Sequence, residues 1–322
     1  MTDPKEPPKP VRGRIRLVSQ RRVSHGLGVE KVGGLSDDEE FRRDLGAYLL
    51  VLPPDAVFTH LTAARLLGWQ LPRLPEQVPV FVAVGLKSRR PRRPGLICSR
   101  LVRPAEPGTR FKLPIDRPEE ILLRASRDLG LLDVLILLES ALALGHVDAE
   151  RMEAVLASGR PGVRLLREAW IRCTGRSESA GETVLQQFHR AMEIPFEPQV
   201  ELVDADGVVL GRADILVTGT TFLHEYDGEH HRSKRQQSID LRRDRGLMAA
   251  YVRKGFTLDD LVNHPAVVMH EIDAALDRTH DLTRLRRWKG IVANSMYSAD
   301  ARDRVMNRWR RLSGLVDWTG SA

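Results

Sequence analysis

The chain has 322 residues, of which 42% are hydrophobic, and a formal net charge of +7. This length predicts more than one domain, and the excess of arginine and lysine favours an anionic partner. Two cysteines exclude a disulfide framework and a zinc site built from cysteines. Because no stretch is apolar enough to cross a membrane and the basic N-terminus lacks the apolar core of a secretory signal, we expect a cytoplasmic protein without a membrane partner.

Residues 1–36 are rich in proline, lysine and arginine, which predicts a mostly disordered basic arm. Ser36 precedes a run of acidic residues, the pattern of a helix N-cap, and this helix is expected to continue through Leu50. A second helix is predicted over Thr59–Trp69, with Gly68 at its end.

Two strands, Val78–Val84 and Leu96–Val102, are expected to form a hairpin with a basic tip. Short helices followed by such a hairpin are the plan of a winged helix, in which the tip lies along phosphates. A solvated loop is the alternative interpretation of this cluster of charges. The residues predicted to contact nucleic acid in this turn are Lys87, Arg89, Arg90, Arg92 and Arg93.

This plan, with the segment Leu61-Thr-Ala-Ala-Arg-Leu-Leu-Gly68, resembles the N-terminal domain of abortive-infection-type antitoxins. The resemblance covers about residues 40–115, and we assign a winged-helix DNA-binding domain to residues 37–113. Residues 114–175 are expected to be helical, and we interpret them as a packing scaffold without chemistry of its own.

The next part of the chain alternates between helical and strand patterns. Apolar residues on one face predict a helix near residues 178–192, with Glu182 at the border of that face. After it we expect three strands, a polar helix near residues 234–250 and one further strand. The three strands are predicted over Gln199–Val203, Val208–Val217 and Thr221–Asp227.

Acidic side chains fall on these predicted elements at places where they could converge. Asp214 lies within the middle strand, and a period of two puts Glu225 and Asp227 on one face of the next strand. Carboxylates at the ends of adjacent strands repel one another unless a cation lies between them. Oxygen ligands favour Mg²⁺ or Mn²⁺, so together with Glu182 and His231 these acids predict a divalent-metal site.

The order of elements and several motifs resemble the restriction-endonuclease-like nuclease fold, in particular its very-short-patch-repair branch. The matching positions, within about residues 176–260, are Glu182-Thr183, Gly211-Arg-Ala-Asp214, Glu225-Tyr-Asp-Gly228, His231, Asp240 and Arg243-Asp244. The expected fold class is therefore α/β (α+β), with a C-terminal αβββαβ core and an N-terminal winged-helix and helical region. The resemblance implies metal-dependent hydrolysis of DNA phosphodiester bonds.

The resemblance also implies roles for single residues. Asp214 would be the central metal ligand, Glu225 the second carboxylate and the carbonyl of Tyr226 the third ligand, while Glu182 would bind the metal through water. Asp240 and Arg243, one helical turn apart, would anchor the site or contact a phosphate. Asp244 would support them.

The chain departs from this family at two places. Asp227 stands where the wider superfamily has a lysine. His231 could take over as general base or leaving-group acid because histidine titrates near neutrality, and Asp227 could instead hold its tautomer. The segment 249–257 is shorter than usual, which puts the last strand in question.

We assign residues 176–275 to an endonuclease-like domain and residues 276–322 to a basic helical tail that covers it. The leading hypothesis is a Mg²⁺-dependent endodeoxyribonuclease whose partner is DNA, and a homodimer stays open. One alternative is a non-catalytic, antitoxin-like DNA-binding transcriptional regulator with a relic nuclease fold, which would have a toxin partner. Another is a zinc-dependent hydrolase that uses His224, His230 and His231.

Overall fold

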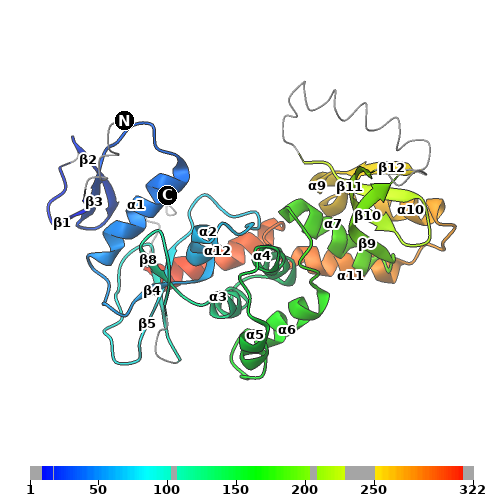
Figure 1. Cartoon of the computed structure of the whole chain (residues 1–322). Coiled ribbons are helices and arrows are strands. Elements are labelled where there is room, and N and C mark those ends of the chain that lie inside the picture. The colour runs from blue at the N-terminus through cyan, green and yellow to red at the C-terminus, as the bar shows by residue number, and fades with distance from the viewer. Residues whose placement is uncertain (1–8, 17, 103–106, 204–208, 229–250, 315–322) are drawn as a thin grey trace, which may run out of the picture. The chain divides into compact units, whose positions relative to one another are not determined.

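The computed structural model describes residues 9–16, 18–102, 107–203, 209–228 and 251–314. The chain has a mixed α/β fold, with three sheets in these residues (Figure 1). It divides into two compact units. The first contains Met1–Trp69, Leu74–Ala125 and Asp303–Ala322, and the second contains Gln70–Arg73 and Ser126–Arg302. None of the helices in the described part of the chain combines the length and the apolar character that crossing a membrane requires.

The first unit opens with a small sheet of order β1-β3-β2. Its strands are Val11–Arg12 (β1), Gln20–Ser24 (β2) and Leu27–Glu30 (β3), and β3 packs on helix α1, Asp37–Leu49. Leu27 and Val29 are buried, and Arg21 forms an ion pair with Asp44 of α1 at 2.6 Å. The prediction of a disordered arm over residues 1–36 is therefore wrong for its described part. The composition did not reveal the two buried apolar residues of β3, or that Glu40 and Asp44 of α1 would pair with Arg21.

The two predicted helices of this unit are confirmed. Helix α1 begins after Ser36, whose hydroxyl accepts from the amide of Glu39 in a capping box. Helix α2 spans His60–Leu66, and Gly68 follows it with a φ of +75°. The hydroxyl of Thr59 does not cap α2 but donates to the buried carboxylate of Asp116 at 3.0 Å.

The hairpin predicted over Val78–Val102 is wrong. The second sheet has the order β6-β5-β4-β8-β7, and β5 pairs with β6 in parallel, with Val80 opposite Leu96. The connection from Val84 to Leu96 is long enough to return along the sheet, which parallel pairing requires. The basic turn therefore lies in a crossover and not at the tip of a wing. The strands are Val57–Phe58 (β4), Val80–Val84 (β5), Leu96–Arg100 (β6), Gly108–Arg110 (β7) and Leu113–Ile115 (β8).

Two helices complete the first unit. Helix α3, Pro118–Ala125, contributes Arg124, which is buried and donates to Asp116 at 3.0 Å. Helix α12, Ala299–Ser313, contributes Trp309, whose ring lies edge-on to Phe81 at 5.4 Å between centroids. The end of the basic tail is thus part of the core of this unit.

The second unit begins with four helices, as the sequence predicts for this region. They are Leu131–Ala143 (α4), Ala149–Leu156 (α5), Val163–Arg172 (α6) and Ala180–Ala191 (α7). Every residue of α4 from Leu131 to Ala141 is buried. Its Asp133 accepts from the amide of Met296 at 2.9 Å, and burial raises the pKa of this carboxyl to about 7.

The third sheet has the order β12-β11-β10-β9, with β9, β10 and β11 antiparallel and β12 parallel to β11. Its strands are Phe196–Val203 (β9), Val209–Val217 (β10), Phe222–Tyr226 (β11) and Val252–Phe256 (β12). The predicted succession of one helix and three strands is confirmed, and the strand that the short segment 249–257 put in question is present. The polar helix predicted near residues 234–250 lies outside the described residues.

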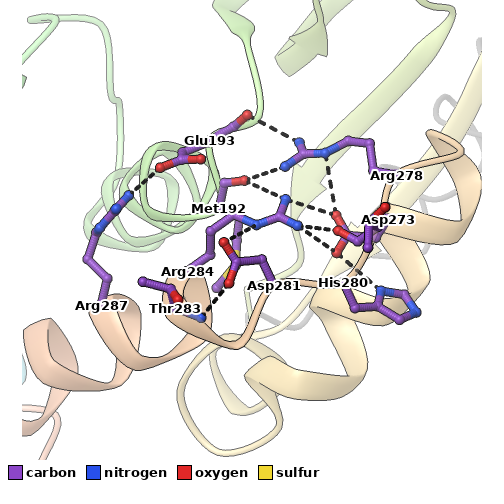
Figure 2. A network of polar contacts seen from close by, with 10 residues as sticks. Met192, Glu193, Asp273, Arg278, His280, Asp281, Thr283, Arg284 and Arg287 are labelled. Atoms are coloured by element: carbon purple, nitrogen blue, oxygen red, sulfur yellow. Dashed lines mark hydrogen bonds and ion pairs between the residues drawn. The ribbon is translucent and has the colours of Figure 1, made fainter.

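Three further helices pack near α7 in this unit, namely Leu258–Val262 (α9), Pro265–Ala275 (α10) and Leu282–Ala293 (α11). Phe188 of α7 and Trp288 of α11 lie fully buried in the shared core. A polar network connects the end of α7 with α10, α11 and the segment between them (Figure 2). The carboxylate of Asp273 contacts Arg284 at 3.3 Å, and Arg278 donates to the carbonyl of Met192, the C-cap of α7, at 2.8 Å.

Candidate active site

Asp214 of β10 makes a hydrogen bond to the end of the neighbouring strand β11. Its carboxylate accepts a hydrogen bond of 2.9 Å from the backbone amide of Tyr226. The pKa of Asp214 is raised to about 6, chiefly by burial and also by the charge of Glu182, against the lowering effect of that amide. Asp214 is therefore electrostatically coupled to an acid from the preceding helix.

Glu182 lies in the first turn of α7, where its amide donates to the N-cap hydroxyl of Ser179 at 3.1 Å. Its carboxylate accepts from the amide of Glu178 at 2.7 Å and from the side-chain amide of Gln199 at 2.8 Å. Burial raises the pKa of Glu182. The side chain thus reaches toward the sheet, as its place at the border of the apolar helical face predicts.

Gln199 of β9 is a site residue that sequence reasoning missed. Its neighbours Pro198 and Val200 pair with Ile215 and Ala213, so Gln199 lies across from Asp214. Its φ of +55° is in the left-handed region, which is uncommon for a residue other than glycine. Its side chain orients the carboxylate of Glu182, and no local pattern could have indicated this.

Glu225 lies near the end of β11 and is partly buried. Burial raises its pKa, the positive charge of Arg253 lowers it, and the charges of Asp214 and Asp227 raise it. Arg253 of β12 donates to the Glu225 carboxylate at 2.6 Å. Sequence reasoning missed this arginine because β12 lies far from β11 along the chain, and only the pairing of the two strands brings Arg253 next to Glu225.

Close approach of the backbone fixes the positions of Tyr226 and Asp227. A Cβ placed on Gly181 of α7 would lie 2.0 Å from a ring carbon of Tyr226, so only glycine allows the start of the helix to lie against this ring. A Cβ on Gly255 would lie 1.9 Å from a carboxylate oxygen of Asp227, whose amide donates to the carbonyl of Phe256 at 2.9 Å.

The structure brings together most of the predicted acids. Glu182, Asp214 and Glu225 come from α7, β10 and β11. The charge of Glu182 raises the pKa of Asp214, and the charge of Asp214 in turn raises the pKa of Glu225. Carboxylate oxygens suit a hard cation such as Mg²⁺. Within the described residues, however, no group of three histidine, cysteine or acidic side chains is close enough to hold a metal ion by itself.

Four predicted site residues lie outside the described residues. They are His231, Asp240, Arg243 and Asp244. The roles that the resemblance implies for them therefore stay predictions.

His224 belongs to the interior of the second unit. Its Nδ1 lies 2.7 Å from Nε2 of His189, and its ring packs edge-on to Phe256. Burial lowers the pKa of His189 to about 4 and that of His224 to about 3, so both rings are neutral at physiological pH. His224 alternates with Glu225 along β11 and faces the other side of the sheet. This placement gives the zinc-hydrolase alternative no support, and its other residues, His230 and His231, lie outside the described residues.

The predicted nucleic-acid-binding residues lie in the crossover between β5 and β6. Arg93 is partly buried and donates to the carbonyl of His25. Arg100 holds the start of the crossover by donating to the carbonyl of Gly85 at 2.6 Å. The exposed members are Lys87, Arg89, Arg90 and Arg92.

The chain is thus a mixed α/β protein in which two carboxylates of the third sheet and one of helix α7 influence one another's ionisation. No family model, no curated protein and no solved structure matches it.

Proposed function

We propose that the protein is a cytoplasmic, metal-dependent DNA endonuclease whose second unit has a restriction-endonuclease-like fold. The observation that carries the proposal is the coupling of Glu182, Asp214 and Glu225, three partly buried acids on three elements, all with raised pKa values. Acids that oppose one another's ionisation are a common feature of functional sites. The succession of α7, three antiparallel strands and a parallel fourth strand supports the same proposal.

In this proposal the carboxylates of Asp214 and Glu225 and the carbonyl of Tyr226 would hold Mg²⁺ or Mn²⁺. When bound, the ion would supply positive charge at the scissile phosphate and acidify nearby water. Glu182 would bind the ion through a water molecule, with its carboxylate oriented by Gln199 and by the amide of Glu178.

Arg253 offers a replacement for the lysine that Asp227 displaces. Its guanidinium contacts the carboxylate of Glu225. A guanidinium pairs with two oxygens of a phosphate as readily as with a carboxylate. Arrival of a DNA phosphate would allow Arg253 to shift its hydrogen bonds to the substrate and leave the Glu225 oxygens free for a cation.

The test is cleavage of supercoiled plasmid by the purified full chain with Mg²⁺ or Mn²⁺. We expect nicked or linear product from the natural protein and none from Asp214→Ala, with DNA binding retained. Glu197→Ala is the matched control, since Glu197 is an exposed acid on β9 of the same sheet, and its product should equal that of the natural protein. Absence of cleavage with every divalent ion tried would contradict the proposal.

A second candidate is the antitoxin-like regulator, which would bind DNA without cutting it and would act with a toxin partner. The observation that favours it is the ion pair of Glu225 with Arg253, because this pair engages one of the proposed metal ligands. Under this candidate, Asp214→Ala and the natural protein would behave alike in every DNA assay.

A further inference from the structure

The first unit contains a pocket of about 430 Å³ whose basic residues come from two distant segments. Arg90, Arg92 and Arg93 come from the crossover between β5 and β6, and Arg311 comes from the end of α12. None of the described residues that line it is acidic. The other lining residues are Pro91, Pro94, Leu96, Ile97, Cys98, Leu312, Ser313 and Gly314.

The larger pocket of the second unit, about 750 Å³, differs from it in charge. Two of its arginines are neutralised by acids. Arg172 pairs with Glu168 at 2.7 Å, and Arg287 pairs with Glu193 at 2.8 Å. Basic residues in a concave surface therefore do not by themselves indicate an anion site, and the absence of acids from the described lining of the first pocket separates the two.

Arg93 supplies a second observation at the first pocket. One of its terminal nitrogens donates to the carbonyl of His25, but its Nε is buried and has no hydrogen-bond partner within the described residues. A buried charged donor without an acceptor is unfavourable. An anion in the pocket would provide a countercharge for this guanidinium.

We propose that this pocket binds a phosphate group of a nucleic acid. A forked guanidinium can donate two parallel hydrogen bonds to a phosphate, and arginines from two sides of a pocket can enclose it. Outside the pocket, the exposed Lys87 and Arg89 extend the positive surface, which suits a polymer with repeated charges better than a single carboxylate. The inference deepens the proposed DNA partner, and it does not depend on cleavage.

The first experiment measures binding of the full-length Asp214→Ala chain to a labelled DNA duplex in EDTA over a series of salt concentrations. Each lost phosphate contact lowers the slope of log Kd against log salt by about 1. We expect this change for Arg311→Ala as well as for Arg90→Ala, together with a several-fold weaker Kd. Arg308→Ala, an exposed arginine on the same helix outside the pocket lining, is the control and should leave the slope unchanged.

The decisive variant is Arg311→Ala, because a merely solvated basic loop would not need a residue of α12. An unchanged slope for this variant, or the same change for Arg308→Ala, would overturn the proposal. Circular dichroism of each variant verifies that it is folded.

Cys98 lines the pocket and provides a second readout that does not depend on affinity. In a Cys173→Ser chain, Cys98 is the one remaining cysteine, and its alkylation can be followed by mass spectrometry. We expect DNA to slow this alkylation, and Arg311→Ala to remove the protection. If DNA does not slow the alkylation of Cys98, or if polyglutamate without DNA slows it equally, the assignment to a nucleic acid would be overturned.

Three probes distinguish the sources of the phosphate. Inorganic phosphate alone, a duplex with a 5′-phosphate and the same duplex without it are compared in the alkylation assay. Preference for the 5′-phosphorylated duplex would assign the pocket to a strand end, and equal protection by both duplexes would assign it to an internal phosphate, and both results support the proposal. Lack of protection by all three would overturn it. A chain in which DNA protects Cys98 but which cuts no plasmid would retain the pocket and lose only the nuclease.

Discussion

Two acids of the second unit, Asp273 and Asp214, differ in what surrounds them. Asp273 is 1% exposed and is surrounded by donors, with Arg278, His280 and Arg284 all in contact with its carboxylate (Figure 2). The carboxylate of Asp214 accepts instead from a backbone amide, that of Tyr226, and lies within the influence of other acids. The ion pairs of Asp273 fix helices to one another. Around Asp214, the neighbouring acids oppose the ionisation of its carboxylate.

The surroundings of an acid thus separate structural acids from functional ones. A structural acid is accompanied by enough cations to offset the cost of its burial. Near Asp214, the two arginines of the described sheet are engaged by other acids, since Arg253 contacts Glu225 at 2.6 Å and Arg212 pairs with Glu178 at 2.5 Å. Positive charge is therefore lacking around Asp214, and we interpret this as the place where an external cation binds.

The greatest change is expected in the rate of DNA cleavage. Asp214→Asn keeps the shape of the side chain and an acceptor for the Tyr226 amide but removes the charge. We expect plasmid cleavage to fall about 1,000-fold, as when a charge-stabilising group is removed from an active site. Asp273→Asn should leave the cleavage rate per folded molecule unchanged. Equal losses for both substitutions would show that the comparison between these acids is mistaken.

The next effect is on stability. Arg284→Ala removes a buried partner of Asp273 and should lower the free energy of unfolding by about 3–5 kcal/mol, because it leaves a buried charge without enough compensation. Arg286→Ala, on an exposed position of the same helix, should change it by less than about 0.5 kcal/mol. Urea denaturation measures both, and a loss below about 1 kcal/mol for Arg284→Ala would refute the structural role.

The pH dependence of stability follows from the raised pKa of Asp214. Its pKa lies at about 6 in the folded chain against an ordinary value of 3.8, so the folded state binds the proton more strongly. The contribution of Asp214 to stability should therefore fall as pH rises from about 4 to 6, by about 1–2 kcal/mol after allowance for partial exposure, and then level off. Other groups of the chain also titrate, so this contribution is read as the difference in stability between the natural chain and Asp214→Asn, which chemical denaturation across the pH range measures.

A cation should act on the same equilibrium. Mg²⁺ should raise the melting temperature of the natural protein at pH 7, where Asp214 is ionised, and not at pH 5. A flat difference in stability between the natural chain and Asp214→Asn from pH 4 to 6 would contradict the coupling.

A further effect concerns the contact between α7 and Tyr226. Gly181→Ala would force a methyl group into the tyrosine ring and should destabilise the chain by about 1–3 kcal/mol, with reduced cleavage. Gly290→Ala is the control, because a Cβ at this exposed position of α11 would have nothing within 4 Å. This control should stabilise the chain by up to about 1 kcal/mol. Thermal melts compare the two, and a neutral Gly181→Ala would show that the contact is unimportant.

The sequence predicted elements better than it predicted their partners. Local patterns were sufficient for α1, with its Ser36 cap, and for α7 followed by three strands. They could not distinguish a hairpin from a parallel pair at β5 and β6, since the same two runs of apolar residues are compatible with either arrangement. The order of those strands depends on pairing with β4, which is far away in the chain.

The candidate site shows the same limit. Glu182, Asp214 and Glu225 could be named in advance because each lies at a recognisable place on its own element. Gln199 and Arg253 could not, since their roles arise from the register of neighbouring strands.

The central claim is that the carboxylates around Asp214 share one cation. Anomalous scattering from crystals grown with Mn²⁺ tests it most directly. We predict one strong peak in contact with the Asp214 carboxylate in the natural protein and no peak in Asp214→Asn. Crystals that contain Mn²⁺ but show no peak beside Asp214, with Arg253 still bound to Glu225, would contradict the account.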